Sequence, residues 1–207
     1  SSTANALNRL GWAASPPLVD VVLPIGISFF TFQGISYVVD VYRQKLAPMP
    51  LGDAAFLMTF FPHLVAGPIV RASELAGQIT KRPDPRTIPA GEAFWLIGQG
   101  LLKKVVVSSY LATALVDPVF DVPGQHSRTE VAAAIYAYAI QIYADFSGYT
   151  DIAIGCALLL GFRFPQNFDA PYRSRSLQEF WHRWHMSLSR WIRDYLYVPL
   201  GGSRGGR

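Results

Sequence analysis

The chain has 207 residues, of which 51% are hydrophobic, 14% aromatic and only 15% charged. Soluble domains carry about 25% charged residues, so this composition favours a membrane protein and excludes an intrinsically disordered chain, while a single cysteine, Cys156, excludes a disulfide framework. The net charge of +4 is concentrated in residues 163–207, which hold eight basic and three acidic side chains, as expected near an anionic membrane surface or on a cytoplasmic face.

The N-terminal third contains two uncharged segments. Residues 1–17 are a polar lead-in without the features of a signal peptide, and the initial Ser-Ser suggests a chain cut from a longer one. Residues 21–39 approach the roughly 20 residues of a membrane span, the alternative being a buried helix of a soluble protein. Residues 54–70 contain Pro62 and Pro68, which predict a kinked or broken membrane helix.

The middle of the chain predicts a loop and a third apolar region. Residues 81–91, with three prolines and three cations, predict the loop. Residues 93–120 form a mainly apolar region that Lys103 and Lys104 interrupt and that ends around Asp117 and Pro118. They predict either two shorter helices or one helix whose lysines extend to a membrane interface.

The fourth apolar region, residues 131–162, is long enough to span a bilayer but contains Asp145 and Asp151. A carboxylate at membrane depth is costly and normally faces a protein interior or a water-filled path. Two interpretations stay open. The aspartates line a site, or they mark an interfacial break between two helices, with Gly148 at the bend.

Residues 177–197, LQEFWHRWHMSLSRWIRDYLY, show helical periodicity. At 100° per residue the apolar side chains occupy an arc of about 160° and three arginines lie opposite, which predicts one amphipathic helix in a membrane interface. His185 falls in the apolar arc beside Trp184, whereas His182 lies at the edge of the cationic side. An imidazole with a pKa near ~6.5 suits proton transfer, and the alternative for His185 is a structural hydrogen bond.

The residues leave several classes of function open. No nucleophile elbow, phosphate-binding loop or dinucleotide fingerprint is present, and the four histidines do not have a metal-ligand spacing. An enzyme and a membrane transport or scaffold protein both remain possible. A soluble nucleic-acid-binding protein is disfavoured, because the arginines alternate with tryptophans instead of forming a continuous basic patch.

Four stretches, collinear along the chain, resemble the membrane-bound O-acyltransferase family and its alginate O-acetyltransferase-like branch: residues 23–43, 60–74, 141–155 and 160–202. The resemblance implies an all-α, polytopic membrane protein with kinked or re-entrant helices, of which residues 1–207 form a single partial domain. It also implies a multi-pass location in the bacterial inner membrane. The predicted partners are the lipid bilayer, a polysaccharide acceptor and periplasmic or extracellular proteins of an acetylation pathway, with no nucleic acid.

The reaction implied by the resemblance is the transfer of an acyl group, acetyl above all, to hydroxyls of an exported polysaccharide such as alginate. The donor would be acetyl-CoA or another activated acyl carrier on the cytoplasmic side, with no bound cofactor or metal. His185 matches the first of two active-site histidines. The second, expected beyond Arg207, would be the base, so the fragment is expected to be inactive alone.

The resemblance further assigns tunnel-lining or structural roles, without individual chemistry, to Trp184, Asp145, Tyr149, Asp151, Asn167 and Tyr172. The alternative function is a membrane transport or scaffold protein in which Asp145, Asp151 and His185 line a polar pathway. Movement of acyl label from donor to polymer would distinguish an enzyme from a transporter, which would redistribute an intact solute.

Overall fold

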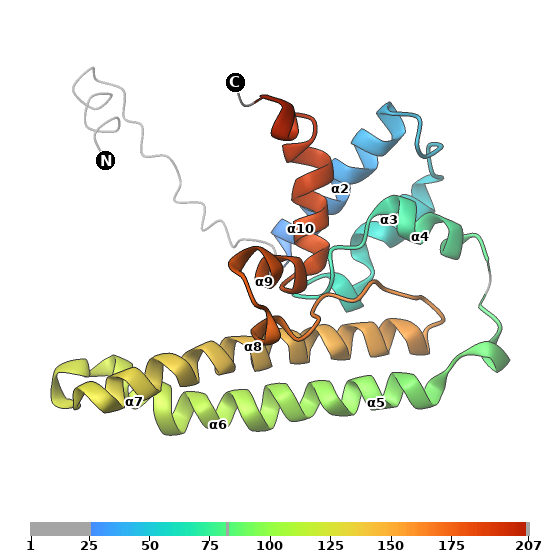
Figure 1. The fold of residues 1–207 in the computed structure, drawn as a ribbon. Coiled ribbons are helices and arrows are strands. Elements are labelled where there is room, and N and C mark those ends of the chain that lie inside the picture. Colours follow the sequence, from blue (N-terminus) through green and yellow to red (C-terminus); the bar gives the residue numbers. More distant parts are fainter. Residues whose placement is uncertain (1–25, 82, 206–207) are drawn as a thin grey trace, which may run out of the picture.

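The structure, a computed structural model, describes residues 26–81 and 83–205, and within these ranges it contains helices and no strands. Two long antiparallel helical rods form one layer, and a group of shorter helices packs on one side of it (Figure 1). The α-helices are α2 (Ile27–Tyr42), α3 (Leu51–Thr59), α4 (Ala72–Ile79), α5 (Ala90–Leu101), α6 (Ser109–Leu111), α7 (Asp117–Asp121), α8 (Arg128–Leu159), α9 (Leu177–Arg183) and α10 (Met186–Ile192).

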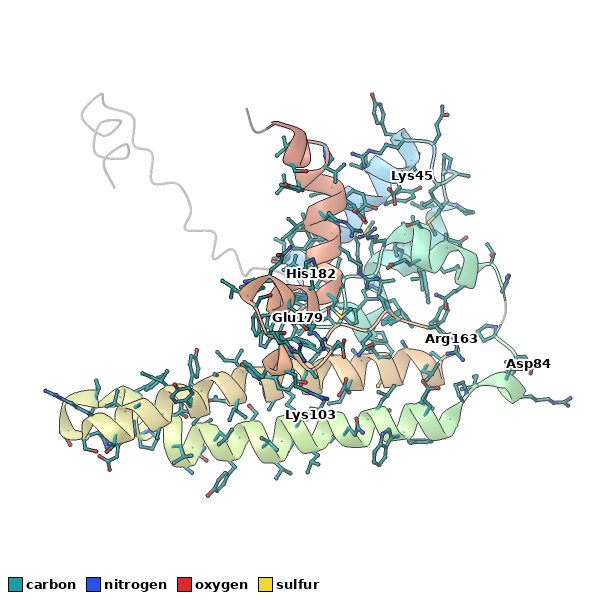
Figure 2. All side chains as sticks on the ribbon, viewed as in Figure 1. Lys45, Asp84, Lys103, Arg163, Glu179 and His182 are labelled. Carbon is teal, nitrogen blue, oxygen red and sulfur yellow. The ribbon has the colours of Figure 1, made fainter. Side chains whose placement is uncertain are left out.

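The first rod runs without interruption from α5 to α7 through π-helical turns at Leu102–Ser108 and Ala112–Val116. Of the two interpretations of residues 93–120, the split into two shorter helices is wrong and the single helix is confirmed. Lys103 and Lys104 turn toward α8 and pair with its aspartates, and their extension to a membrane interface stays a prediction. Figure 2 shows Lys103 between the two rods. A π-helical turn rotates less per residue than an α-helix, so consecutive side chains can face the same neighbour.

The second rod, α8, is a single helix of 32 residues that begins with a capping box. The Ser127 hydroxyl accepts the backbone N–H of Glu130, and the Glu130 carboxylate accepts the N–H of Ser127 at 2.7 Å. This reciprocal pairing satisfies two backbone donors that a helix start otherwise leaves free. The helix continues through Asp145 and Asp151, so the predicted interfacial break in residues 131–162 is wrong.

Gly148 lies at a close approach of the two rods, and not at a bend. A Cβ atom on Gly148 would lie 2.7 Å from the carbonyl oxygen of Gly100, and one on Gly100 would lie 2.5 Å from that of Gly148. Gly155 has the same relation to Ala93. Glycine is used here because the backbones need the space of a side chain.

Replacing Gly148 by alanine is therefore expected to destabilise the protein, although alanine favours a helix by about 1 kcal/mol. The added methyl group forces the rods apart, and such overpacking costs about 1–3 kcal/mol. Thermal unfolding of the full-length protein in detergent measures the loss. Gly98→Ala is the matched control, since nothing lies within 4 Å of its added Cβ, and equal midpoints for the two variants would contradict the close approach.

The second layer packs α3, α4 and a strap of residues 162–170 against the C-terminal half of α8. The prediction that residues 54–70 form a broken helix is confirmed: α3 ends at Thr59, Pro62 lies in a 3₁₀ turn (Phe61–His63), and Pro68 follows in extended chain. The shared core consists of buried residues from all these segments, namely Leu57, Phe60, Val70, Ala72, Leu75, Ala157 and Phe164.

The predicted amphipathic helix over 177–197 is wrong as a continuous element. The chain leaves the helix at Trp184, which is extended, and at His185, whose φ of 44° lies in the left-handed region. The helical wheel therefore mixed side chains from two helices: Trp181 of α9 is 55% exposed, whereas Trp191 of α10 is 7% exposed and donates to the carbonyl of Phe32.

Of the first predicted span, residues 21–39, the structure shows α2 from Ile27; residues 21–25 and the polar lead-in 1–17 lie outside the described residues. Within the two described ranges, no helix has both the length and the hydropathy needed to cross a membrane.

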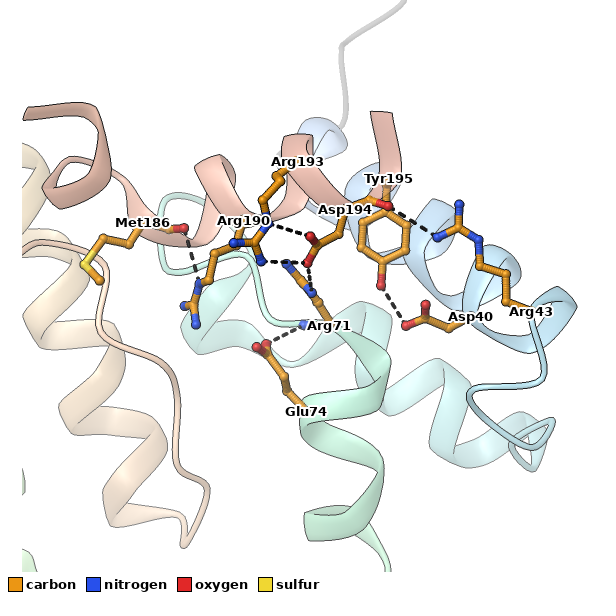
Figure 3. A network of polar contacts seen from close by, with 9 residues as sticks. All are labelled: Asp40, Arg43, Arg71, Glu74, Met186, Arg190, Arg193, Asp194 and Tyr195. Carbon is orange, nitrogen blue, oxygen red and sulfur yellow. Dashed lines mark hydrogen bonds and ion pairs between the residues drawn. The ribbon is translucent and has the colours of Figure 1, made fainter. Parts of the chain in front are cut away.

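A polar network fixes the C-terminal segment to α2 and α4 (Figure 3). Arg71 pairs with Asp194 at 2.8 Å, and the hydroxyl of Tyr195 donates to Asp40 at 2.7 Å. The hydrogen bond from Arg193, and to a smaller extent the one from Arg71, holds the pKa of the Asp194 carboxyl below its usual range. The π-helical turn that follows α10 (Arg193–Tyr197) is thereby held through both an acidic and an aromatic side chain.

Candidate functional site

The break between α9 and α10 is built by the strap. The backbone N–H of Asp169 donates to the carbonyl of Arg183 at 3.0 Å, and the N–H of Met186 donates to the carbonyl of Asn167 at 2.9 Å. These two bonds bracket Trp184 and His185. The strap thus supplies hydrogen bonds that a continuous helix would have made internally, and the two bracketed residues are free to leave the helix.

The buried side chain of Asn167 also stabilises the break between α9 and α10. Its Oδ1 atom accepts the backbone N–H of Ser187 at 3.1 Å and the Ser187 hydroxyl at 2.8 Å. The Ser187 hydroxyl in turn accepts the N–H of Ile69 at 2.9 Å. Asn167 and Ser187 are both buried, so these bonds satisfy polar groups that are shielded from water.

His185 is held at this break with its ring against Phe146 of α8. The two rings meet edge to face, with centroids 4.7 Å apart and planes at 83°. Its Nε2 atom is buried and has no hydrogen-bond partner among the residues of the two described ranges. Burial lowers the pKa of His185 from 6.5 to about 4, so the imidazole is neutral at pH 7 and can accept a proton or donate a hydrogen bond.

Trp184 and Tyr172 belong to an aromatic cluster beside His185. Trp184 stacks on Phe180 with centroids 5.5 Å apart and meets Phe168 at a right angle at 5.1 Å. Tyr172 lies 6.3 Å from Trp184, and its hydroxyl donates to the carbonyl of Ala139 on α8 at 2.7 Å. The structure therefore brings His185, Trp184, Asn167 and Tyr172 to one place.

The acidic residues of α8 are in a different arrangement from the one expected. Asp151 pairs with Lys103 and Asp145 with Lys104, both at 2.5 Å, and Lys104 also lies over the ring of Tyr149 at 5.8 Å. Asp145 and Tyr149 thus face the first rod and do not meet His185. Each aspartate is neutralised by a lysine that the sequence analysis had treated separately.

Asp151 has a second role in the geometry, because it borders the site. Together with Asn167 and Phe168 of the strap and Lys103 and Gln99 of the first rod, it lines a hollow of about 400 Å³. Polar and aromatic side chains on one wall suit a ligand with hydroxyl groups and apolar faces. Tyr149 instead lines an apolar hollow of about 350 Å³ with Cys156.

The remaining predictions concern His182 and metal binding. His182 is exposed on α9 (Figure 2) and lines a groove with Trp181 and Arg190. In the part of the chain that the structure describes, no three His, Cys, Asp or Glu side chains are close enough to hold a metal ion.

Sequence reasoning missed Phe146 and Phe168 as parts of the site. Both flank residues that the sequence analysis singled out, Asp145 and Asn167, but an aromatic residue in an apolar segment has no periodicity that distinguishes a histidine-packing role from the core. The contact of Phe146 with His185 joins α8 to the break and depends on the tertiary fold.

A model of the membrane-bound O-acyltransferase family matches residues 54–207 of the chain. The chain is 47% identical over 190 residues to "Probable alginate O-acetylase" of Pseudomonas aeruginosa, covering 91% of this chain and 36% of that protein. It is 36% identical to the peptidoglycan O-acetyltransferase of Helicobacter pylori, over 95% of this chain and 42% of that protein. It is 30% identical to the teichoic acid D-alanyltransferase of Bacillus subtilis, over 84% of this chain and 45% of that protein. The chain thus spans 36% of the length of the first of these relatives.

Proposed function

The chain belongs to the membrane-bound O-acyltransferase family, and from this premise we propose that its protein moves an acetyl group from an activated carrier to hydroxyls of an exported polysaccharide. Residues 1–207 would form one part of a multi-pass enzyme of the bacterial inner membrane. The observation that supports the proposal is the Nε2 atom of His185, which is buried and has no hydrogen-bond partner in the part of the chain that the structure describes. Backbone bonds on either side hold this residue at a positive φ, which is uncommon for residues other than glycine.

In the proposed reaction a hydroxyl oxygen of the polymer attacks the carbonyl carbon of a thioester. The new carbon–oxygen bond forms, the carbon–sulfur bond breaks, and the hydroxyl proton passes through imidazole to the leaving thiolate. His185 serves as the supporting histidine that orients or polarises the carbonyl, beside a second histidine supplied by the rest of the enzyme. General acid–base assistance of this kind contributes about 10²–10⁴-fold.

An alginate-like polymer is the favoured acceptor. Relatives named for alginate and for peptidoglycan are both O-acetyl-transferring proteins by name, and the higher identity is to the alginate group. The hollow beside Asp151 and Asn167 has polar and aromatic walls suited to a sugar ring. Periplasmic or extracellular proteins of the same acetylation pathway would then be its partners.

The alternative of a transport or scaffold protein has no specific support. It requires Asp145, Asp151 and His185 to line one polar pathway, but both aspartates are paired with lysines. Only Asp151 borders the hollow next to the site.

An acceptor panel tests the proposed substrate. Membranes that contain the full-length protein are incubated with [¹⁴C]acetyl-CoA and, in parallel, with alginate, peptidoglycan or teichoic acid. We expect hydroxylamine-sensitive label in alginate above the level in membranes without the protein. Label in peptidoglycan or teichoic acid alone would contradict the proposed acceptor.

A further inference from the structure

His185 has a backbone conformation that contacts with the surrounding protein must stabilise. A histidine at φ 44° and ψ 55° is in the left-handed region, which non-glycine residues hold only when their surroundings impose it. His185 is also the residue that precedes α10, yet its side chain makes no capping hydrogen bond. The free N–H groups at the start of α10 must therefore be satisfied from elsewhere.

Asn167 accepts two of these N–H groups, from a segment about 20 residues earlier in the sequence. Its carbonyl oxygen accepts the N–H of Met186, and its Oδ1 atom accepts the N–H of Ser187. One residue thus caps the first two positions of α10, directly after His185. An Asn side chain normally does this for its own helix, whereas here it does so across the fold.

The amide of Asn167 is itself oriented by α8. Its Nδ2 atom donates to the hydroxyl of Thr150 at 3.5 Å, and Thr150 is buried on the same helix as Phe146, against which the ring of His185 packs. Asn167 therefore connects the backbone of the break to the helix that holds the imidazole. Movement of this side chain would change where Nε2 of His185 points.

We propose that Asn167 is the positioning residue for His185: it caps α10 from the strap and thereby holds the imidazole against Phe146 with its Nε2 atom buried. The effect on acyl transfer rests on the proposed function. The effect on the imidazole itself does not, so the two are measured separately.

The test compares Asn167→Ala with the wild type in the full-length protein, using diethyl pyrocarbonate and mass spectrometry to follow modification of His185. Because Nε2 is buried only while the break keeps its geometry, we expect modification of His185 to be about tenfold faster or more in the variant. Asn167→Asp keeps an acceptor oxygen for Ser187 but loses the donor to Thr150, so its modification rate is expected to lie between those of the wild type and Asn167→Ala. A wild-type rate in Asn167→Ala would overturn the proposal.

Gln78→Ala is the matched control, because it also removes an amide that clamps the strap. Gln78 donates to the carbonyl of Arg163 and accepts its N–H, at the end of the strap remote from His185. It should leave the modification rate of His185 unchanged. Equal increases in Gln78→Ala and Asn167→Ala would show general loosening of the strap and would overturn the specific role of Asn167.

Acyl transfer provides the second readout. Asn167→Ala should lower kcat, and adding it to His185→Ala should cause no further loss, because both changes act through the same imidazole. A further loss in the double variant would overturn the proposal. If Asn167→Ala does not accumulate, Ser187→Ala takes its place, because it removes one of the two bonds to Oδ1 of Asn167. It should accelerate modification of His185 by a smaller factor. An unchanged modification rate in Ser187→Ala would count against the proposal. Absence of transfer in the wild type would contradict the proposed function, while the modification rates would still decide the role of Asn167.

Discussion

Replacing His185 by alanine in the full-length protein is expected to lower the rate of acyl transfer about 10²–10³-fold, the loss typical of removing one group that polarises the reacting carbonyl. The reason is geometric: the ring packs edge to face against Phe146, and its Nε2 atom is buried with no hydrogen-bond partner among the residues that the structure describes. Removing the imidazole takes this atom away while leaving the strap bonds to Arg183 and Met186, which are backbone bonds.

His182→Ala is the matched control, since His182 lies on the exposed face of α9 three residues earlier. It should keep transfer close to the wild-type rate at equal abundance in the membrane. Wild-type transfer by His185→Ala, or equal losses in the two variants, would contradict a role of His185 in the reaction.

The pH dependence of transfer by the wild-type protein also tests the role of His185. Burial lowers the pKa of His185 to about 4, so its neutral form is already complete well below pH 7 and protonation is confined to acidic conditions. We expect no loss of transfer from this residue as the pH falls from 8 to 6, whereas an ordinary histidine would be substantially protonated near ~6.5.

The second large effect concerns the ion pair between the two rods. Asp151→Leu leaves the Lys103 ammonium without its carboxylate partner, and the side chain of Lys103 is only 30% exposed to solvent. Losing one partner of a fully buried pair costs about 3–5 kcal/mol, and partial exposure reduces this to about 1–3 kcal/mol. The midpoint of thermal unfolding in detergent should fall accordingly.

The double variant Lys103→Met/Asp151→Leu should recover most of that loss, because apolar side chains of similar volume can replace an ion pair without leaving a bare charge. Asp145→Leu is the control within the same helix. The Asp145 side chain is 52% exposed, so its removal should cost less than about 1 kcal/mol. A double variant as unstable as Asp151→Leu would show that the pair itself, and not the unpaired lysine, determines the stability.

The family resemblance predicted the all-α class. Local sequence patterns predicted the interruption of residues 54–70, because prolines lack the N–H group that a helix requires. They failed at residues 177–197. The apolar spacing there fits one helix, but hydrogen bonds from Asn167 and Asp169 compete with the intrahelical bonds and stabilise the break. A helical wheel contains no information about such partners, which are more than ten residues away.

The same limitation explains the error at Gly148. A glycine between two aspartates fits a bend, and the close approach of the Gly100 backbone is visible only when the two rods are placed together. The ion pairs of Lys103 and Lys104 with the aspartates of α8 likewise become visible only when the two rods are placed together. In contrast, the family resemblance had indicated both Asn167 and His185, although not that the first caps the helix that follows the second.

The central claim is that this chain forms part of an acyltransferase, and one measurement tests it most directly. Membranes containing the full-length protein are supplied with [¹⁴C]acetyl-CoA and alginate, and the label bound to the polymer as a hydroxylamine-sensitive ester is counted over time. The account predicts ester-bound label that accumulates with the wild type and is lost with His185→Ala. Label that stays in the donor, or that crosses the membrane only as an intact solute, would contradict it.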